Sequence, residues 1–443
     1  MQRKIMTETT NILHDKANLP EGYKNSPLGA IPKEWEVKKL GDISTQLGNF
    51  SFSRAQLTDK TQRLRYIHYG DIHVMSERDN VDLRKDDLPF LLDGLIDNTK
   101  IENQNFPLLQ DGDVIFVDAS EDYEGIGNCW EVLNTNGYEI ISGLHTIAIR
   151  FDKKFVSVGF GRHVFKNRKS STALRVIAHG TKVYSLSYKN MTKLKIAIPP
   201  LPEQQKIAEI LSTWDATIEK QNALIEQLEL RKRGLMQQLL TGKLRLRNDE
   251  GERFNEEWKK ARLGEFFKET TEFVGDRVIE PIAVGVHGIR LRTDIFSKKL
   301  SKDYSKNKII RKNQICFGIG TNSIVFGILE TDNIYCVSPA YKTYNLLNIN
   351  VVFCNALLSV YNNYLGQKYM IISARQGKSV DFDALFSEKI KIPSLAEQTA
   401  IAKVLSTADR EIEIEKQKLA ALQNQKKELM QVLLSGKIRV KVS

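Results

Sequence analysis

The sequence predicts an α+β protein in which two globular domains of mixed α/β structure accompany a pair of long coiled-coil helices, related by a pseudo-twofold internal repeat. The main observation is that the segment from Ile198 to Arg245 occurs again, without a gap, from Ile392 to Arg439. The two copies are offset by 194 residues, and 23 of their 48 positions are identical. This period is too long for a solenoid unit, so it indicates two domain-sized halves.

A second, weaker repeat marks where each half begins. Trp35 precedes Leu40-Gly41 at the same spacing at which Trp258 precedes Leu263-Gly264. We therefore divide the chain into an N-terminal tail (1–24), a first globular domain (25–197), a first repeated helix (198–245), a second globular domain (246–391) and a second repeated helix (392–443). The two globular domains share almost no sequence. Similar flanking segments around dissimilar globular domains are typical of one scaffold that presents two different recognition surfaces.

The repeated segment is predicted to be a helix with a heptad seam. Apolar residues recur at steps of four and three over more than four heptads in both copies, which is the a/d pattern of a coiled coil. The seam and its expected interface consist of Ile207, Leu211, Trp214, Ile218, Ile225, Leu228, Leu235 and Leu239 in the first copy, and of Ile401, Leu405, Ile412, Leu419, Leu422, Leu429 and Leu433 in the second. The 32 steps from Ile207 to Leu239 predict a length of roughly 48 Å.

Polar residues interrupt both seams at matching positions. Gln221 corresponds to Glu415, and Lys232 corresponds to Lys426. Because polar a/d residues fix register at a cost in stability, we expect the two helices to pair with each other. The glycines that follow the helices are typical C-terminal stops. Two ordinary core helices in separate domains would not share so many residues.

The globular domains are expected to contain short strands joined by loops. Three segments read as strands, namely 113–118, 144–150 and 314–319, and 338–344 reads as a turn leading into another. Glycine-rich loops follow several of them. Loops on a rigid sheet commonly carry recognition residues.

Composition favours a protein that binds nucleic acid. The 65 basic and 54 acidic residues give a net charge of +11 and a pI near 9.2, which is a prior for DNA or RNA. The four cysteines form no CxxC pair, which argues against a zinc ribbon or a disulfide framework. The N-terminus lacks an apolar signal core, and no apolar run approaches a membrane span, so we expect a cytoplasmic protein.

Candidate DNA-binding residues are clustered in both globular domains. Phosphate contacts use Lys and Arg, guanine is read by Arg and Lys, and adenine is read by Asn and Gln. The candidates in the first domain are Arg54, Arg63, Arg65, Tyr66, His68, Tyr69, His145, Arg162, Lys166, Arg168, Lys169, Arg175 and Lys182. Those in the second are His287, Arg290, Arg292, Asn322, Ser323, Tyr341, Lys342, Arg375, Gln376 and Lys378. A single cluster of this kind is more often a solvated face, but both domains carry one, which favours DNA contact.

Catalytic motifs are not found. The Gly377-Lys378-Ser379 run has Ile372 where a phosphate-binding loop needs its first glycine. Ser323 replaces the third glycine of a dinucleotide fingerprint, and the only Pro-Pro, Pro199-Pro200, lies at a helix start instead of in an adenine-methyltransferase loop. The histidines lack metal-ligand spacing. We therefore expect no catalytic residues, no metal and no cofactor bound by this chain.

The chain as a whole resembles the specificity subunit of type I restriction-modification systems. The resemblance rests on the two Trp…Leu-Gly entries, on Tyr66-Ile67-His68-Tyr69-Gly70-Asp71-Ile72-His73, on Ser338-Pro339-Ala340-Tyr341-Lys342, and on the two Pro-x-Leu-x-Glu-Gln helices that end in Leu-Leu-x-Gly-Lys-x-Arg. These motifs extend over nearly all of residues 25–440. Ala396 stands where the first copy has Pro202, which does not weaken the resemblance.

The resemblance implies two target-recognition domains, each reading one half of a bipartite, non-palindromic site in double-stranded DNA. It implies antiparallel helices that separate the two domains, set the spacing between the half-sites and dock two methyltransferase subunits. S-adenosylmethionine and the adenine chemistry would belong to those subunits, and motor-nuclease subunits can join the assembly. The alternatives are a restriction enzyme with its own catalytic domain, against which the missing motifs count, and a coiled-coil protein scaffold without DNA specificity.

Overall fold

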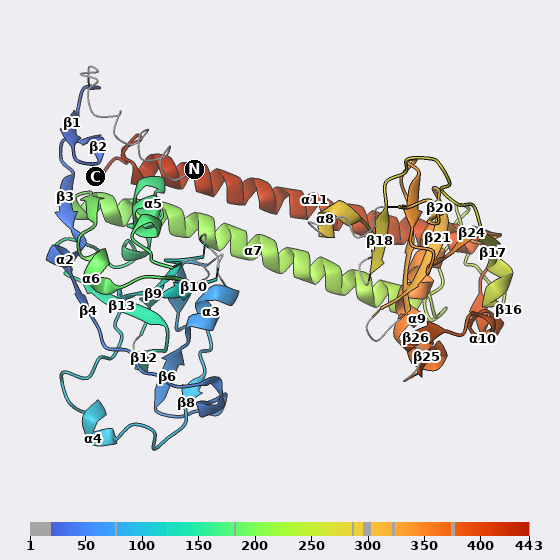
Figure 1. Cartoon of the computed structure of the whole chain (residues 1–443), viewed down its shortest axis with the longest axis horizontal. Helices are drawn as coiled ribbons and strands as arrows, with labels where there is room; N and C mark the ends of the chain where they lie inside the picture. The colour runs from blue at the N-terminus through green and yellow to red at the C-terminus, as the bar shows by residue number, and fades with distance from the viewer. Residues whose placement is uncertain are drawn as a thin grey trace. The chain divides into compact units, whose positions relative to one another are not determined.

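The computed structural model describes residues 19–75, 78–121, 123, 125–135, 137–180, 183–285, 288–295, 303–320, 324–373 and 377–442. The chain forms two compact units, unit 1 (Met1–Lys220 with Leu419–Ser443) and unit 2 (Gln221–Lys418). Each unit therefore contains a globular body and portions of two long helices, α7 (Leu201–Leu239) and α11 (Leu395–Leu434) (Figure 1). Both helices lie inside the segments that the heptad pattern predicted, which confirms that prediction. Among the described residues, no helix is long and apolar enough to cross a membrane.

Unit 1 is built on two sheets that share a core. The five-stranded sheet has the order β4 (Ser44–Gln46), β13 (Thr146–Phe151), β9 (Val114–Val117), β11 (Cys129–Leu133), β7 (Asn80–Asp82). The four-stranded sheet has the order β12 (Glu139–Ser142), β6 (Leu64–Ile67), β8 (Phe90–Leu91), β5 (Leu57–Thr58). The β11–β7 and β12–β6 pairs are parallel and the others antiparallel.

Strand β9 shows how the alternation of side chains builds this unit. Val114 and Phe116 lie in the core that contains Ile207 and Leu211 of α7, whereas Ile115 and Val117 lie in the core shared with the four-stranded sheet. Successive side chains of a strand point to opposite faces, so this fully apolar strand is buried on both sides. One face of the five-stranded sheet is thereby fixed to the long helices, and its other face supports the second sheet.

The remaining elements of unit 1 are short. They are the two-stranded pairs β1 (Tyr23–Ser26) with β2 (Gly29–Pro32), β3 (Glu36–Lys39) with β15 (Lys195–Ile198) and β10 (Ala119–Ser120) with β14 (Tyr184–Ser185); the helices α2 (Leu40–Ile43), α3 (Tyr69–Val74), α4 (Asn98–Ile101), α5 (Arg168–Val176) and α6 (Tyr188–Met191); and two 3₁₀ turns, η1 (Arg54–Gln56) and η2 (Gly161–His163).

Unit 2 has a different body. Its antiparallel sheet has the order β17 (Phe267–Thr270), β24 (Lys342–Leu346), β21 (Gln314–Ile319), β22 (Ile324–Ile328), and it packs on helix α9 (Val351–Tyr369). The two-stranded pairs are β16 (Lys259–Arg262) with β27 (Lys389–Ile392), β18 (Ile282–Gly285) with β19 (Gly288–Leu291), β20 (Lys308–Ile310) with β23 (Tyr335–Val337), and β25 (Met370–Ser373) with β26 (Gly377–Val380). The 3₁₀ turn η3 (Leu263–Phe266) and helices α8 (Arg292–Ile295) and α10 (Phe382–Ser387) complete it.

The predicted strands are all present. The segment 314–319 is β21 itself, 113–118 contains β9, 144–150 overlaps β13, and the turn at 338–341 leads into β24. The boundaries differ by one or two residues, which is the usual uncertainty at element ends.

Candidate functional site

The duplicated Glu-Gln motif anchors each long helix to its body. In unit 1 the carboxylate of Glu203, 2% exposed, accepts a hydrogen bond from the Trp35 indole at 3.0 Å and two from the Arg439 guanidinium at 2.6 and 2.9 Å. The adjacent Gln204 accepts from the backbone N–H of Ser157 at 2.9 Å and donates to the carbonyl oxygen of Pro199 at 2.8 Å. Every polar group that the motif buries in this way has a partner.

Unit 2 repeats this arrangement with the roles of the repeats exchanged. Glu397 accepts from the Trp258 indole at 3.2 Å and from the Arg245 guanidinium at 2.6 and 2.8 Å. Gln398 accepts from the backbone N–H of Asn350 at 2.9 Å. Arg245 ends the first repeated segment and Arg439 ends the second, so each unit is completed by the arginine of the other repeat.

The helix seam is buried as the heptads predicted. Ile207, Leu211, Ile401 and Leu405 are at most 1% exposed, and Ile225, Leu228 and Ile412 are 7% exposed. Leu239 and Leu433 are also buried, while Trp214, Ile218, Leu235, Leu419, Leu422 and Leu429 are half-buried. At their ends the seams merge with the cores of the bodies, so the helices and bodies of each unit form one packed structure.

The polar interruptions pair across the helices. The Gln221 amide donates to the carboxylate of Glu415 at 2.7 Å and to its carbonyl oxygen at 3.1 Å. Lys232 pairs with Asp409 in unit 2, and Lys426 pairs with Asp215 in unit 1. These two ion pairs occupy equivalent positions of the repeat. Within each unit, partners early in one helix meet residues late in the other, so the helices are antiparallel.

A cluster of aromatic and imidazole rings in unit 1 is formed by helix α3, its N-cap residue and the loop before β13. Tyr69 is 4.5 Å from His68, 5.3 Å from His145 and 6.0 Å from His73, measured between ring centroids. His145 is half-exposed, with its Nδ1 3.4 Å from the carboxylate of Asp118. We call Tyr69, His68, His73 and His145 the ring cluster. Sequence reasoning had singled out all of these rings except His73.

The ring cluster is polar and locally strained. His145 adopts a φ of +56°, which is uncommon outside glycine and is often found at functional sites. Burial raises the pKa of Asp118 against the opposing effect of His145, and burial followed by the charge of Arg54 lowers the pKa of His68. Arg54 itself pairs with Asp71 at 2.6 Å. Imidazole and phenol groups can both donate and accept hydrogen bonds, as base edges require.

Two predicted contact residues of unit 1 are structural instead. Tyr66 is fully buried, and its hydroxyl donates to the carbonyl oxygen of Phe50 at 2.7 Å. Arg162 is 1% exposed and lies 3.3 Å from the carboxylate of Asp79. Neither side chain can reach DNA in this structure, because the folded core encloses both. A charge or ring near other basic residues in sequence does not reveal whether the fold buries it.

The other basic candidates of unit 1 are accessible or half-accessible. Arg63 pairs with Glu139 and Arg65 with Asp87. Arg168 and Lys169 are exposed, and the Lys169 ammonium donates to the carbonyl oxygen of Leu28. Lys166 and Arg175 are half-buried. Lys182 lies outside the described residues.

In unit 2 the structure brings part of the predicted set together. Ile289 and Leu291 of β19 pack in one apolar cluster with Tyr341, and Arg290 between them is exposed. Arg292 follows β19 and is half-buried; Lys342 lies over the ring of Phe382 at 4.7 Å, and Lys378 is exposed. His287, Asn322, Ser323, Arg375 and Gln376 lie outside the described residues.

A buried ionic network in unit 1 was not anticipated. Arg162 contacts Asp79, His163 and Ser212 through its guanidinium, at 3.3, 3.2 and 3.1 Å, and lies 3.6 Å from Asp215 of α7. Lys426 of α11 lies 3.9 Å from Asp79. The network therefore ties the body to both long helices. No spacing in the sequence indicates it, because its members are far apart along the chain.

Burial sets the charges of this network. Burial would raise the pKa of Asp79, yet Arg162, His163 and Lys426 hold it well below its usual value. Burial lowers the pKa of His163 to about 3, with Arg162 acting in the same direction. Burial raises the pKa of the nearby Glu131 to about 7, although Arg162 and the backbone N–H groups of Gly159 and Arg162 oppose this.

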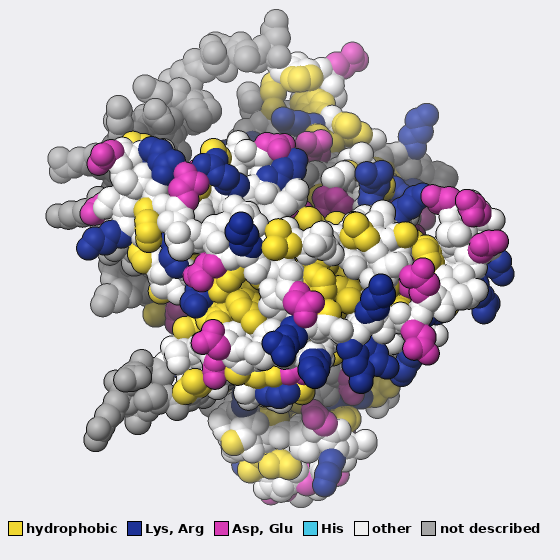
Figure 2. All heavy atoms as spheres, turned by 90° about the vertical axis from the view of Figure 1, so that its right-hand side faces the viewer, with side chains coloured by type: hydrophobic (Ala, Val, Ile, Leu, Met, Phe, Trp, Pro, Cys, Tyr) yellow, Lys and Arg dark blue, Asp and Glu magenta, His cyan; other side chains and the backbone are white. Residues whose placement is uncertain are grey.

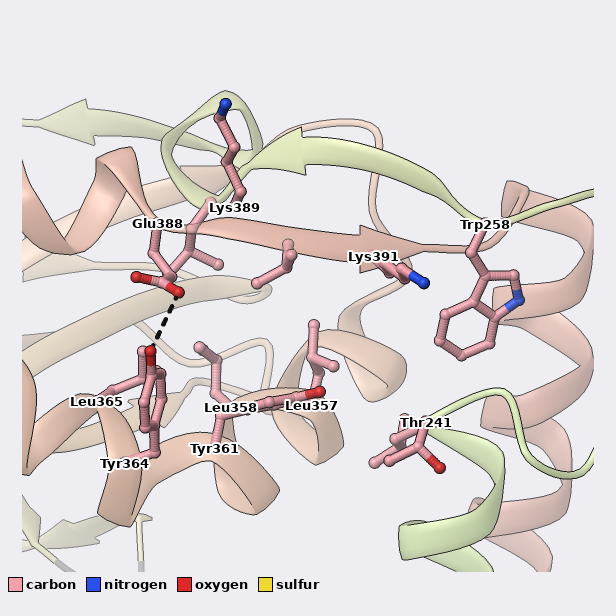
Figure 3. A pocket seen from close by; sticks show the side chains of 13 residues that line it. Thr241, Trp258, Leu357, Leu358, Tyr361, Tyr364, Leu365, Glu388, Lys389 and Lys391 are labelled. Atoms are coloured by element: carbon pink, nitrogen blue, oxygen red, sulfur yellow. Dashed lines mark hydrogen bonds between the residues drawn. The ribbon is translucent and has the colours of Figure 1, made fainter.

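Unit 2 contains a cavity of about 240 Å³ between α9, the β16–β27 pair and the end of α7 (Figure 3). Its lining is mainly apolar and includes Trp258, Leu357, Leu358 and Tyr361. Tyr364 donates to Glu388 at 3.4 Å at one end of the cavity. Such a lining is suited to packing rather than to acid–base chemistry.

Known proteins share this sequence pattern and fold. A family model described as the type I restriction modification DNA specificity domain matches residues 32–230 and again 255–424. In Methanocaldococcus jannaschii, a protein named provisionally as the MjaX type I restriction enzyme specificity subunit is 26% identical, over 95% of this chain and 97% of its own length. The type I restriction enzyme MjaVIII specificity subunit of the same organism is 24% identical over the same shares.

A solved structure has the same fold. It comes from a study of complex assembly and conformational transition of the type I R-M system, and it matches with a TM-score of 0.53 and 14% identity. The match covers 92% of this chain and 99% of the solved chain. At this identity the likeness concerns the fold.

Proposed function

Because the chain belongs to the type I restriction modification DNA specificity family, we propose that each of its two units reads one half of a bipartite, non-palindromic DNA site. The observation that carries this proposal is that the two units anchor their long helices in the same way but have different globular bodies. Glu203 and Glu397 hold the helices in the same way, whereas unit 1 presents two sheets and unit 2 presents a single four-stranded sheet with α9. Equivalent frames suit identical partners, and unlike bodies suit different base sequences.

In unit 1 we assign the ring cluster to base reading. His145 projects from a strained loop conformation, and Tyr69 lies against three imidazoles. The exposed Arg168 and Lys169 suit phosphate contacts. In unit 2 we assign the equivalent role to Arg290 and Tyr341. Tyr69, His73, His145, Arg290 and Tyr341 are accessible or half-accessible, as contact with a groove requires. His68 is only 8% exposed and lies against the Tyr69 ring, so it supports that ring and does not reach a groove itself.

The partners are two methyltransferase subunits, with motor-nuclease subunits where the cell supplies them. In this assignment the chain is not an enzyme, and S-adenosylmethionine belongs to the methyltransferase subunits. Large apolar side chains on the outer faces of the helices support docking there, since Leu224, Leu230 and Ile414 are 40, 64 and 45% exposed. The chain alone should neither methylate nor cut DNA, and methyl transfer by the purified chain would refute this assignment.

Domain exchange tests the two-reader proposal. Residues 246–391 are replaced by the second body of another family member, and the hybrid is expressed with its methyltransferase subunit. Methylome sequencing should show one new half-site and one unchanged half-site. The matched exchange of residues 25–197 should change the other half alone. A change in both halves from either exchange would contradict the proposal, and an absence of sequence preference in the wild-type complex would favour a scaffold role.

A further inference from the structure

Each unit contains a two-stranded antiparallel ribbon at an equivalent position of the repeat. In unit 1 it is β3 with β15, and in unit 2 it is β16 with β27. Residues directly opposite each other in such a pair share one face of the ribbon, and neighbours along a strand alternate between faces. The register therefore determines which side chains are presented together.

In unit 2 this register collects four cations on one face. Lys260 lies opposite Lys391, and Arg262 lies opposite Lys389. All four residues are exposed, whereas Ile390, which alternates with the two lysines of β27, is half-buried. Lys389, Ile390 and Lys391 all contribute to the lining of the cavity beside Trp258. In Figure 3 the ammonium end of Lys389 points away from the labelled apolar side chains of the cavity. We call the side that carries Lys260, Arg262, Lys389 and Lys391 the basic ribbon face.

The ribbon of unit 1 lacks this feature. Its corresponding face carries Lys39 opposite Lys195 and Val37 opposite Ala197. Two of the four positions are thus apolar where unit 2 has Lys260 and Lys391. The Lys260–Lys391 pair is thus specific to unit 2, whereas the cation pair Arg262–Lys389 has a counterpart in Lys39–Lys195 of unit 1.

Electrostatic interactions within unit 2 give no reason for the four cations of the basic ribbon face to lie together. Like charges directly opposite each other in a sheet destabilise it. Within the part of the chain that the structure describes, none of the four side chains has a carboxylate within ion-pair distance; Glu265 accepts only from the backbone N–H of Arg262, at 3.0 Å. Residues that cost stability in the free protein commonly serve an interaction.

We propose that the basic ribbon face binds phosphates of duplex DNA independently of sequence, an inference that rests on the proposed DNA-reading role. Protein interfaces are depleted in lysine, whereas three of the four side chains of this face are lysines. Phosphate contacts, in contrast, use lysine and arginine and need no apolar group. Figure 2 looks onto the side of unit 2 where β16 lies in Figure 1, and shows Lys and Arg side chains spread around a hydrophobic centre.

The test compares salt dependence in the assembled complex of this chain with its methyltransferase subunits. In the variant, Lys260, Arg262, Lys389 and Lys391 are each replaced by Gln. The slope of log affinity against log salt should fall by up to about 3.6, because each phosphate contact contributes about 0.9. Cognate and non-cognate duplexes should lose affinity by the same factor at fixed salt, so the sequence preference should be retained.

Two matched controls separate this face from general charge loss. The pair K260Q/K391Q should lower the slope by up to about 1.8, whereas K39Q/K195Q, which removes equal charge from the ribbon of unit 1, should leave it unchanged. The thermal midpoint of the fourfold variant should equal or exceed that of the wild type, since like-charge pairs are removed.

An unchanged slope in a folded fourfold variant would overturn the proposal, as would an equal effect of both pairs. Loss of methyltransferase subunit binding with an unchanged slope would show that the face binds an acidic protein surface instead. These results differ from failure of the DNA-reading role itself, in which the wild-type complex would show no sequence preference.

Discussion

Arg439 and Glu203, 236 residues apart in sequence, form a bidentate ion pair with N–O distances of 2.6 and 2.9 Å. The Glu203 side chain is 2% exposed and that of Arg439 is 36% exposed. Arg439, near the end of the sequence, thus completes unit 1, whose first strand begins at Tyr23. Arg245 and Glu397 make the same contact in unit 2.

Removing the arginine should destabilise unit 1 strongly. R439M leaves the buried Glu203 carboxylate with the Trp35 indole as its side-chain donor, and an under-paired buried charge costs roughly 2–4 kcal/mol. E203Q should cost less, because the amide carries no charge. Urea denaturation of the full chain measures both. K441M, which changes an exposed neighbouring cation, should stay within about 0.5 kcal/mol of wild type; equal losses from R439M and K441M would contradict this prediction.

The pH dependence of stability should reveal two opposing groups in the buried network. The pKa of His163 is lowered to about 3 in the folded chain. Between about pH 3 and 6.5 the unfolded chain therefore binds a proton at His163 that the folded chain does not bind. For this reason the free energy of unfolding decreases as pH falls through this range. The pKa of Glu131 is raised to about 7, so its contribution to stability is lost as pH rises from about 4.3 to 7.

Between about pH 4.5 and 6.5 these effects should largely cancel in the wild type. E131Q should therefore make the unfolding free energy of unit 1 rise with pH by up to about 1.4 kcal/mol per pH unit, and H163Q should make it fall. Denaturation midpoints across this range provide the measurement. The comparison uses slopes, so a constant loss of stability in either variant does not matter; parallel curves for all three proteins would contradict the assignment.

Replacing the Gln221–Glu415 pair by two leucines should raise the thermal midpoint of the helix pair and weaken its register. The amide and carboxylate are half-buried at positions where the heptad calls for apolar residues. Thermal unfolding measures the stability, and disulfide cross-linking at cysteines introduced across the helices measures register. Q221L alone should destabilise, because Glu415 then loses its donor on the partner helix and keeps only Lys418 of its own helix. A stabilising single variant would show that the pair contributes nothing to pairing.

Substitution at His145 should alter one half-site. H145N keeps a residue that tolerates the left-handed conformation and a hydrogen-bonding side chain, whereas H145A removes the side chain. We expect H145A to reduce discrimination at one or two base pairs of the half-site read by unit 1, by about 1–3 kcal/mol per pair. Binding to single-base variants of the site measures it. H179A, in an exposed histidine of the same unit, serves as the control; unchanged discrimination in H145A would exclude the ring from base reading.

Lengthening both long helices should change the spacing of the half-sites and not their sequences. Four residues inserted between Gln221 and Lys232, and at the equivalent place between Glu415 and Lys426, add roughly 6 Å of rise, which is close to two base pairs at about 3.4 Å each. Methylome mapping should show the same half-sites with a gap longer by one or two base pairs. An unchanged gap would show that the helices do not set the spacing between the half-sites. Altered half-sites would mean that the helices also read bases.

Local patterns in the sequence were sufficient to predict the two long helices and the division of the chain into two halves. The heptads from Ile207 to Leu239 and from Ile401 to Leu433 predicted two helices, because the period of a helix is only a few residues long. Aligning the two copies also showed that the polar positions Gln221 and Glu415 match, which predicted that the helices pair. The strand at 314–319 was predicted from another local signal, a short run of residues typical of strands. Absence of gaps between the two copies also showed that the chain has two equivalent halves.

Tertiary structure alone decided which charges are available to a partner. Arg162 and Tyr66 were selected as contacts because their neighbours in sequence are basic or aromatic, yet long-range packing against Asp79 and Phe50 buries them. The basic ribbon face exists only because β16 pairs with β27 in one register, some 130 residues along the chain, and a shift by one residue would separate its cations. Burial and register depend on contacts between distant segments, and a single sequence does not state which distant segments meet.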